Sequence, residues 1–120
     1  MKPQYRAGKN IAIKVPPHEY EKTVSFYRDI IGLEERESSS SDQYESISFS
    51  FGEKNLWIDK ISSVSQAEIW LELVTDNIAE AVSHLEMNGV VRRDEIEKLP
   101  DDLNGFWVCS PSNIIHLITE

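Results

Sequence analysis

Cysteine is almost missing from this 120-residue sequence, and so are long apolar segments. The single cysteine, Cys109, excludes a disulfide within the chain and favours a reducing, cytoplasmic location. Its neighbours Trp107 and Val108 are apolar, which is typical of a buried cysteine rather than a nucleophile. No apolar run approaches the roughly 20 residues of a membrane span. No apolar secretory leader follows Met1. We therefore expect a cytoplasmic protein without a membrane partner.

Positive charge is also scarce. The chain has 12 Lys and Arg residues against 21 Asp and Glu residues, for a net charge of −9. No basic stripe is present, so nucleic acids and anionic membranes are not expected as partners. A negative surface attracts cationic ligands more than anionic ones. Hydrophobic residues make up 40% of the chain, which indicates one globular domain spanning residues 1–120.

The first half of the sequence predicts a strand, a helix and three further strands. Apolar residues alternate through 11–15, and residues 23–31 repeat at three- and four-residue spacing before Gly32, as in a helix closed by glycine. The remaining strands are predicted at 33–37, 44–51 and 56–61, and the serine-rich residues 38–42 read as a polar turn.

The second half repeats this order. A strand is predicted at 68–73, then a helix with Asp76 as N-cap and Gly89 after its end, then strands from 90, at 106–109 and at 114–118. Three pairs of landmarks lie 58, 57 and 58 residues apart: Asn10 and Glu68, Gly32 and Gly89, and Asn55 and Asn113. The nearly constant spacing predicts a duplication with repeat units at about 8–61 and 67–120.

Four segments carry a family resemblance. They are Asn-Ile-Ala-Ile-Lys-Val at 10–15, Ser-Phe-Tyr-Arg-Asp-Ile-Ile-Gly-Leu at 25–33, Trp-Leu-Glu-Leu-Val-Thr-Asp-Asn-Ile at 70–78, and Ser-Pro-Ser-Asn-Ile-Ile-His-Leu at 110–117. In these segments the chain resembles the vicinal oxygen chelate superfamily of glyoxalases, bleomycin resistance proteins and extradiol dioxygenases. The resemblance implies an α+β fold in which two tandem β-α-β-β-β units form a curved mixed sheet, usually in a homodimer.

The resemblance also implies where a metal would bind. The family usually has His or Gln at the start of each unit and Glu in the last strand of each unit. The matching positions here hold Asn10 and Glu68 at the starts, and Ile58 and His116 in the last strands; a shift of one residue would substitute Trp57 or Asp59 for Ile58. Isoleucine cannot ligate a metal, and an amide oxygen is a weak ligand. Only Glu68 and His116 remain as weak candidates, whereas a catalytic metal usually has three protein ligands.

Strand alternation predicts one face that carries Glu68, Trp70, Glu72 and His116, with Ile115 and Leu117 turned toward the helices. Two carboxylates and an imidazole could perform acid–base chemistry or bind the positive end of a ligand. Other interpretations stay open: a solvated Glu72, a packed Trp70, and a neutral histidine near the core.

The leading hypothesis is a small-molecule binding protein of the bleomycin-resistance type, without a catalytic metal. Its ligand would be cationic or aromatic. The expected ligand-binding residues are Asn10, Ile58, Glu68, Trp70, Glu72 and His116. The alternative is a lyase, isomerase or thiol transferase that uses Ni²⁺, Zn²⁺ or Mn²⁺ held by Glu68, His116 and Asn10.

Overall fold

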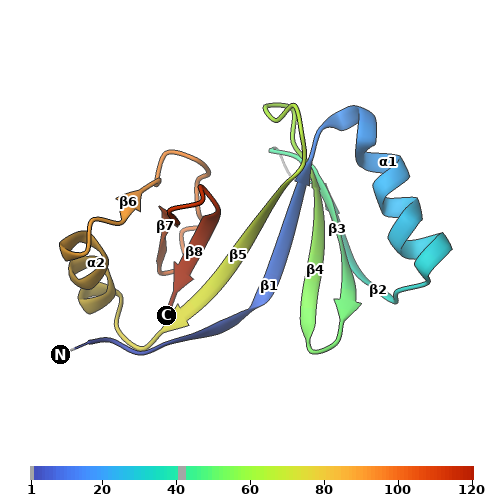
Figure 1. The fold of residues 1–120 in the computed structure, drawn as a ribbon. Helices are drawn as coiled ribbons and strands as arrows, with labels where there is room; N and C mark the ends of the chain where they lie inside the picture. Colours follow the sequence, from blue (N-terminus) through green and yellow to red (C-terminus); the bar gives the residue numbers. More distant parts are fainter. Residues whose placement is uncertain (1, 41–42) are drawn as a thin grey trace. The chain divides into compact units, whose positions relative to one another are not determined.

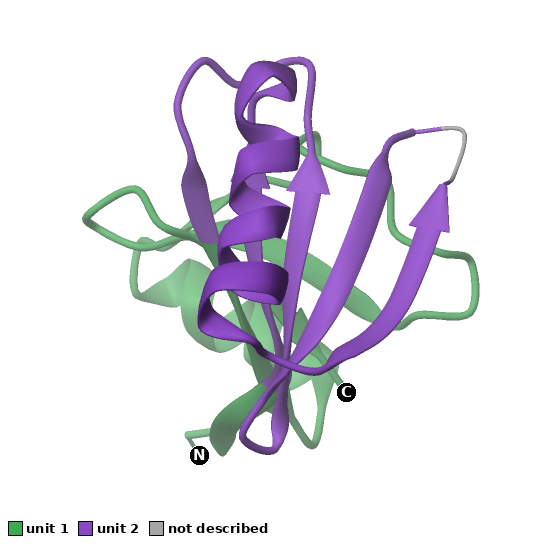
Figure 2. Ribbon diagram, turned by 90° about the vertical axis from the view of Figure 1, so that its right-hand side faces the viewer, with its two compact units in different colours: residues 1–8, 70–120 green, residues 9–69 purple. Residues whose placement is uncertain are grey.

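The computed structural model describes residues 2–40 and 43–120. The chain divides into two compact units (Figure 2): unit 2 is Lys9–Ile69, and unit 1 is Met1–Gly8 with Trp70–Glu120. Helices and strands follow the order β-α-β-β-β twice (Figure 1), so the predicted α+β class with two tandem units is confirmed. None of the helices within the described residues has the length and apolar character of a membrane-spanning segment.

Unit 2 is a mixed sheet with one helical segment. Its strands lie in the order β2-β3-β4-β1, with β1 and β4 parallel and the other neighbours antiparallel. The elements are β1 (Tyr5–Val15), α1 (Pro17–Ser25), the π-helix η1 (Phe26–Ile31), β2 (Glu35–Ser40), β3 (Glu45–Phe51) and β4 (Lys54–Lys60). The first residues of β1, 5–8, belong to unit 1.

The predicted first helix is one continuous segment with two geometries. Pro17 opens α1, where its missing N–H costs nothing and its fixed φ suits the first turn. The last turns widen into η1, which ends at Gly32 with a φ of 82°. The N–H groups of both Gly32 and Leu33 donate to the carbonyl of Tyr27. The predicted glycine end of this helix is therefore confirmed.

The serine-rich segment differs from its prediction as a turn. Ser38, Ser39 and Ser40 belong to β2 and pair with β3, while residues 41–42 of the predicted turn lie outside the described part of the chain. The hydroxyls of Ser39 and Ser46 lie 3.2 Å apart. All of β2 is exposed, and an exposed edge strand needs no apolar alternation. The polar composition therefore concealed the strand.

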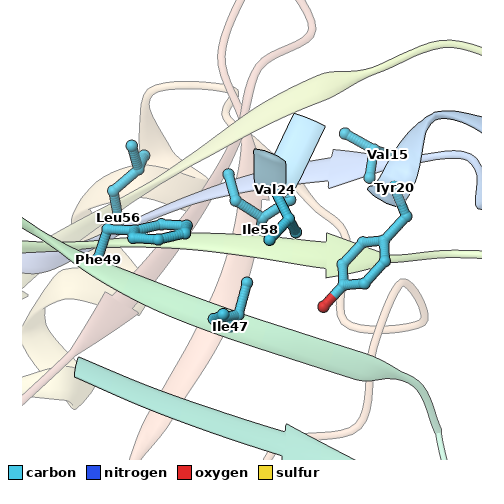
Figure 3. Close-up of a cluster of buried hydrophobic side chains, with 7 residues drawn as sticks. All are labelled: Val15, Tyr20, Val24, Ile47, Phe49, Leu56 and Ile58. Atoms are coloured by element: carbon cyan, nitrogen blue, oxygen red, sulfur yellow. The ribbon is translucent and has the colours of Figure 1, made fainter. Parts of the chain in front are cut away.

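The core of unit 2 lies between α1 and its sheet. Figure 3 shows the two helix side chains, Tyr20 and Val24, with the sheet side chains Val15, Ile47, Phe49, Leu56 and Ile58. Phe49 and Ile58 are completely buried. The alternating apolar residues of β1, β3 and β4 thus share the face covered by α1.

Unit 1 has the corresponding arrangement. It consists of β5 (Glu68–Thr75), whose first two residues fall in unit 2, α2 (Ile78–Met87), β6 (Val91–Arg92), β7 (Gly105–Cys109) and β8 (Ile115–Thr119). The strand order is β5-β8-β7-β6, and β5 and β8 are parallel. Its core beneath α2 contains Ala81, Phe106, Val108 and Ile118.

The N-cap of α2 is Asn77 rather than the predicted Asp76. The Asn77 backbone is extended, and its side-chain oxygen accepts a hydrogen bond from the N–H of Glu80 at 3.0 Å. Asp76 instead pairs with Arg6 at 2.8 Å. Both residue types cap helices well, so the sequence could not decide between adjacent positions.

Candidate functional site

Each unit has a sheet face turned away from its own helix, which we call its far face. In unit 2 the register places residues on this face in matched rows, because side chains alternate along each strand. Asn10 lies opposite Asn55, Ala12 opposite Trp57, and Lys14 opposite Asp59. Ser48 and Ser46 of β3 continue the last two rows. The far face of unit 2 is therefore polar, whereas its α1 side is apolar.

Ile58 is not on this face. It is completely buried in the α1-side core, so it cannot contact a ligand on the far face. Its neighbours Trp57 and Asp59 point to the far face because adjacent strand residues alternate. Trp57 and Asp59, the residues of the alignment shifted by one position, are therefore the ones on the far face.

Asn10 is the centre of a hydrogen-bond network. Its side-chain oxygen accepts from the Trp57 indole Nε1 at 2.9 Å and from the Asn55 Nδ2 at 3.1 Å. The Asn55 oxygen in turn accepts from Arg36 Nη1 at 2.7 Å. Three strands, β1, β2 and β4, thus contribute to one network on the far face of unit 2.

A buried ion pair lies farther along the same face. Lys14 Nζ is 2.8 Å from Asp59 Oδ2, and the two side chains are only 3% and 5% exposed. The Lys14 ammonium also lies 5.0 Å from the centre of the Tyr44 ring. A buried ion pair is strongly interdependent, because removing one partner leaves the other charge buried.

The far face of unit 1 is aromatic. The rings of Trp70 and Trp107 meet edge to face, with centroids 5.2 Å apart, and both residues are buried. The Trp107 Nε1 donates to the carbonyl of Glu97 at 2.9 Å. Trp70 therefore has the packed role that the sequence left open, and so does Trp107.

Glu72 shares this far face and is half-buried. Its side chain lies against Gly8: a Cβ added at Gly8 would be 2.7 Å from the Glu72 Cδ. Such a distance is an overlap, so glycine is required at this position while the glutamate keeps its place.

His116 is on the opposite side of the sheet from Glu72, which corrects the predicted grouping. Its register partners are Leu71 and Val108, and Val108 belongs to the core beneath α2. Glu72 instead pairs with Leu117. In β8, apolar residues occupy both the odd and the even positions. The sequence of this strand could therefore not show which of its two faces meets the helix. Glu68 is exposed and belongs to the residues of unit 2.

Comparison with known proteins places this geometry in a known fold. No protein-family model matches the chain, and no curated protein matches its sequence. Among solved structures, a hypothetical protein from Bacillus halodurans C-125 matches with a TM-score of 0.70 and 12% identity, over 98% of this chain and 94% of that one.

Two enzymes of related architecture also match. The Mn(II)-bound glyoxalase from Novosphingobium aromaticivorans matches with a TM-score of 0.67 and 16% identity, over 98% of this chain and 39% of that one. The methylmalonyl-CoA epimerase from Mycobacterium tuberculosis matches with a TM-score of 0.66 and 10% identity, over 95% and 87% of the two chains. The chain has the vicinal oxygen chelate fold. The expected glyoxalase and bleomycin-resistance-like architecture is therefore confirmed.

The residues of unit 2 do not fit the catalytic metal that the vicinal oxygen chelate fold implies. The Asn10 oxygen already accepts two hydrogen bonds, and the Trp57 indole is a donor without a lone pair for a metal. Asp59 is engaged by Lys14. Within residues 2–40 and 43–120, no three His, Cys, Asp or Glu side chains are grouped so that they could hold a metal ion.

Three residues of the hydrogen-bond network and the ion pair, Arg36, Asn55 and Lys14, were not among the predicted ligand-binding residues. A charged residue within the apolar alternation of 11–15 was a usable signal for Lys14. Arg36 gave none, because its position depends on an irregularity in β2 that the sequence does not reveal.

Proposed function

We propose that the protein binds a small organic molecule without a catalytic metal, and that the far face of unit 2 is part of the binding site. The observation that carries the proposal is the Trp57-to-Asn10 hydrogen bond. It joins two of the positions at which the vicinal oxygen chelate resemblance implies metal ligands. A donor and an acceptor that satisfy each other leave a polar surface for recognition but no ligand set for a metal.

Glu68 remains a proposed contributor from unit 2. Trp70 and Glu72 remain proposed contacts on the far face of unit 1, whereas Ile58 and His116 are withdrawn for the reasons given above. The structural neighbours support a small-molecule role in general, since they include a glyoxalase and a methylmalonyl-CoA epimerase. Affinity alone requires no metal, so an incomplete ligand set does not weaken a binding function.

The test combines metal analysis with a ligand screen. Purified protein exposed to Ni²⁺, Zn²⁺ and Mn²⁺ should retain no stoichiometric metal after desalting. In a screen of small aromatic compounds, those that bind should alter the tryptophan fluorescence. Trp57→Phe should remove most of this change in fluorescence. The matched control is Trp107→Phe, whose ring is buried in unit 1. Stoichiometric metal that Asn10→Ala abolishes would contradict the proposal.

A metal-dependent lyase, isomerase or thiol transferase is the second candidate, and the similarity to a Mn(II)-bound glyoxalase favours it. The sequence offered Glu68 and His116 as its ligands; Glu68 belongs to unit 2 and His116 lies on the α2 side of unit 1, so each residue is tested by itself. Elemental analysis of Glu68→Ala and His116→Ala against the wild type tests it directly. Metal retained by the wild type and lost in both variants would support it, and an empty wild type would reject it.

We extend the proposal to a cytoplasmic homodimer, by analogy with the fold rather than from a described surface. Sedimentation equilibrium over a hundredfold range of concentration measures the association directly. A single monomeric species throughout would contradict the dimer and leave ligand binding unaffected.

A further inference from the structure

A β-bulge on the edge strand of unit 2 aims one arginine at the polar network. The register between β2 and β3 shifts between Glu35 and Glu37, so Arg36 is an extra residue with no partner of its own in the pairing. Bulges commonly redirect a side chain in this way. The Arg36 guanidinium reaches past β3 and donates to Asn55 on β4 at 2.7 Å.

The network fixes the direction of this contact. Asn55 donates its Nδ2 to Asn10, so its oxygen is the atom that remains for Arg36. Asn10 is in turn held by the Trp57 indole. The Asn10 oxygen is the final acceptor of the network, because both Asn55 and Trp57 donate to it. The group that positions the guanidinium is thus the neutral amide of Asn55 and not a carboxylate.

The contrast with other cations of unit 2 is clear. Arg28 pairs with Asp29 at 3.1 Å, and Lys60 lies 3.6 Å from Glu45. Within residues 2–40 and 43–120, no carboxylate lies within ion-pair distance of Arg36. A guanidinium has five donors in a planar fork that matches the oxygens of a carboxylate or phosphate. One donor serves Asn55, and the exposed side chain presents the others.

We propose that Arg36 anchors an oxyanion group, a carboxylate or a phosphate, of the organic ligand, with the Trp57 ring as the neighbouring aromatic surface. This inference rests on the proposed function and names the class of its ligand. It opposes the expectation of a cationic ligand from the net charge of −9. Surface charges are screened beyond a Debye length of about 8–10 Å at physiological salt, whereas a charged hydrogen bond acts at contact.

Three compounds of one shape test the sign of the charge: benzoate, benzamide and benzamidine are an anion, a neutral molecule and a cation on the same ring. Binding is followed by the NMR signal of the Trp57 indole N–H, assigned by its loss in Trp57→Phe. We expect benzoate to bind at least about tenfold more tightly than the other two, as charged hydrogen bonds imply. Phenyl phosphate distinguishes a preference for phosphate from one for carboxylate.

Two variants and a matched control assign the effect to Arg36. Arg36→Gln should weaken benzoate binding about tenfold or more, and Arg36→Lys should recover only part of it, since lysine lacks the fork. Arg28→Gln removes the same charge from η1 of the same unit and should change the affinity less than about twofold.

The outcomes separate this inference from the proposed function. Tighter binding of benzamidine than of benzoate, or equal losses in Arg36→Gln and Arg28→Gln, overturns the anchor while ligand binding stands. Binding of none of the compounds at 10 mM also overturns the anchor. The proposed function fails separately, if the metal analysis finds a stoichiometric ion that Asn10→Ala removes.

Discussion

The far faces of unit 1 and unit 2 carry different chemistry on the same plan of strands. Unit 2 presents the Asn10 network and the buried pair of Lys14 and Asp59. Unit 1 presents the packed rings of Trp70 and Trp107. The helix-covered faces are alike by comparison, since apolar side chains fill both.

This difference follows from what each face must do. A face covered by a helix has to exclude water, so only apolar side chains of suitable size are accepted there. Among the described residues, no helix of the same unit covers the far face, so packing against a helix does not restrict its side chains to apolar ones. The two units therefore combine apolar helix-covered cores with different far faces, one polar and one aromatic.

The largest effect should come from the buried ion pair that sets unit 2 apart. Asp59→Leu alone should lower the free energy of unfolding by about 3–5 kcal/mol, because the Lys14 ammonium would stay buried after the Asp59 carboxylate is lost. Adding Lys14→Met should recover most of the loss. Urea denaturation measures both, with Glu45→Gln of the half-exposed Lys60 pair as control, at about 0–1 kcal/mol. A double variant as unstable as Asp59→Leu would argue against a paired role.

Because the two cores are similar, removing one buried ring from each should lower the free energy of unfolding by equal amounts. Phe49→Ala in unit 2 and Phe106→Ala in unit 1 should each lower the free energy of unfolding by about 3–5 kcal/mol, since both rings are buried. Phe51, two residues after Phe49 in β3, is 49% exposed and serves as the control. Its alanine variant should lose less than about 1 kcal/mol. A markedly smaller loss for Phe106→Ala would show that only one core is tightly packed.

In unit 1, the close approach of Gly8 to the Glu72 side chain can be tested by substitution. Gly8→Ala should destabilise the protein by about 1–3 kcal/mol, because its Cβ would overlap the Glu72 side chain. Glu72→Ala in the same chain should relieve most of this loss. Thermal unfolding of the two single variants and the double variant gives the interaction energy between the sites. Simple additivity would exclude a steric conflict.

The smallest effects on stability should come from exposed carboxylates. Each unit has an exposed carboxylate that accepts a hydrogen bond from a nearby arginine. Hydrogen bonds from Arg28 and Ser25 lower the pKa of Asp29 in unit 2, and the bond from Arg93 lowers the pKa of Glu95 in unit 1. A lowered pKa in the folded state stabilises the protein above the ordinary carboxyl pKa. That stabilisation is lost as the pH falls through the lowered pKa.

Carbon-13 NMR titration of the carboxyl groups measures these pKa values. Arg28→Gln should raise the pKa of Asp29 toward its ordinary value of 3.8 and leave Glu95 unchanged. Arg93→Gln should do the reverse. A shift of both carboxyl groups in either variant would indicate a general charge effect instead of a specific bond.

The fold was predictable because its main signals are local. Alternation marked β3 and β5, and Gly32 marked the end of the first helix. The site was less predictable, because it depends on which phase of a strand faces the helix. His116 lies in a strand with apolar residues in both phases, and the Ile58 position was uncertain by one residue. Arg36 depends on a bulge, which arises from pairing between strands and not from the strand's own sequence.

The bulge at Arg36 also bears on the solubility of the chain during and after folding. The edge strand β2 of unit 2 has three charged residues, Glu35, Arg36 and Glu37, and its irregular register offers a poor template for another strand. The edge strand β6 of unit 1 is only two residues long, which limits pairing by a different means. Both edge strands thus discourage strand addition. Deletion of Arg36 would regularise one of them and raise the tendency to aggregate.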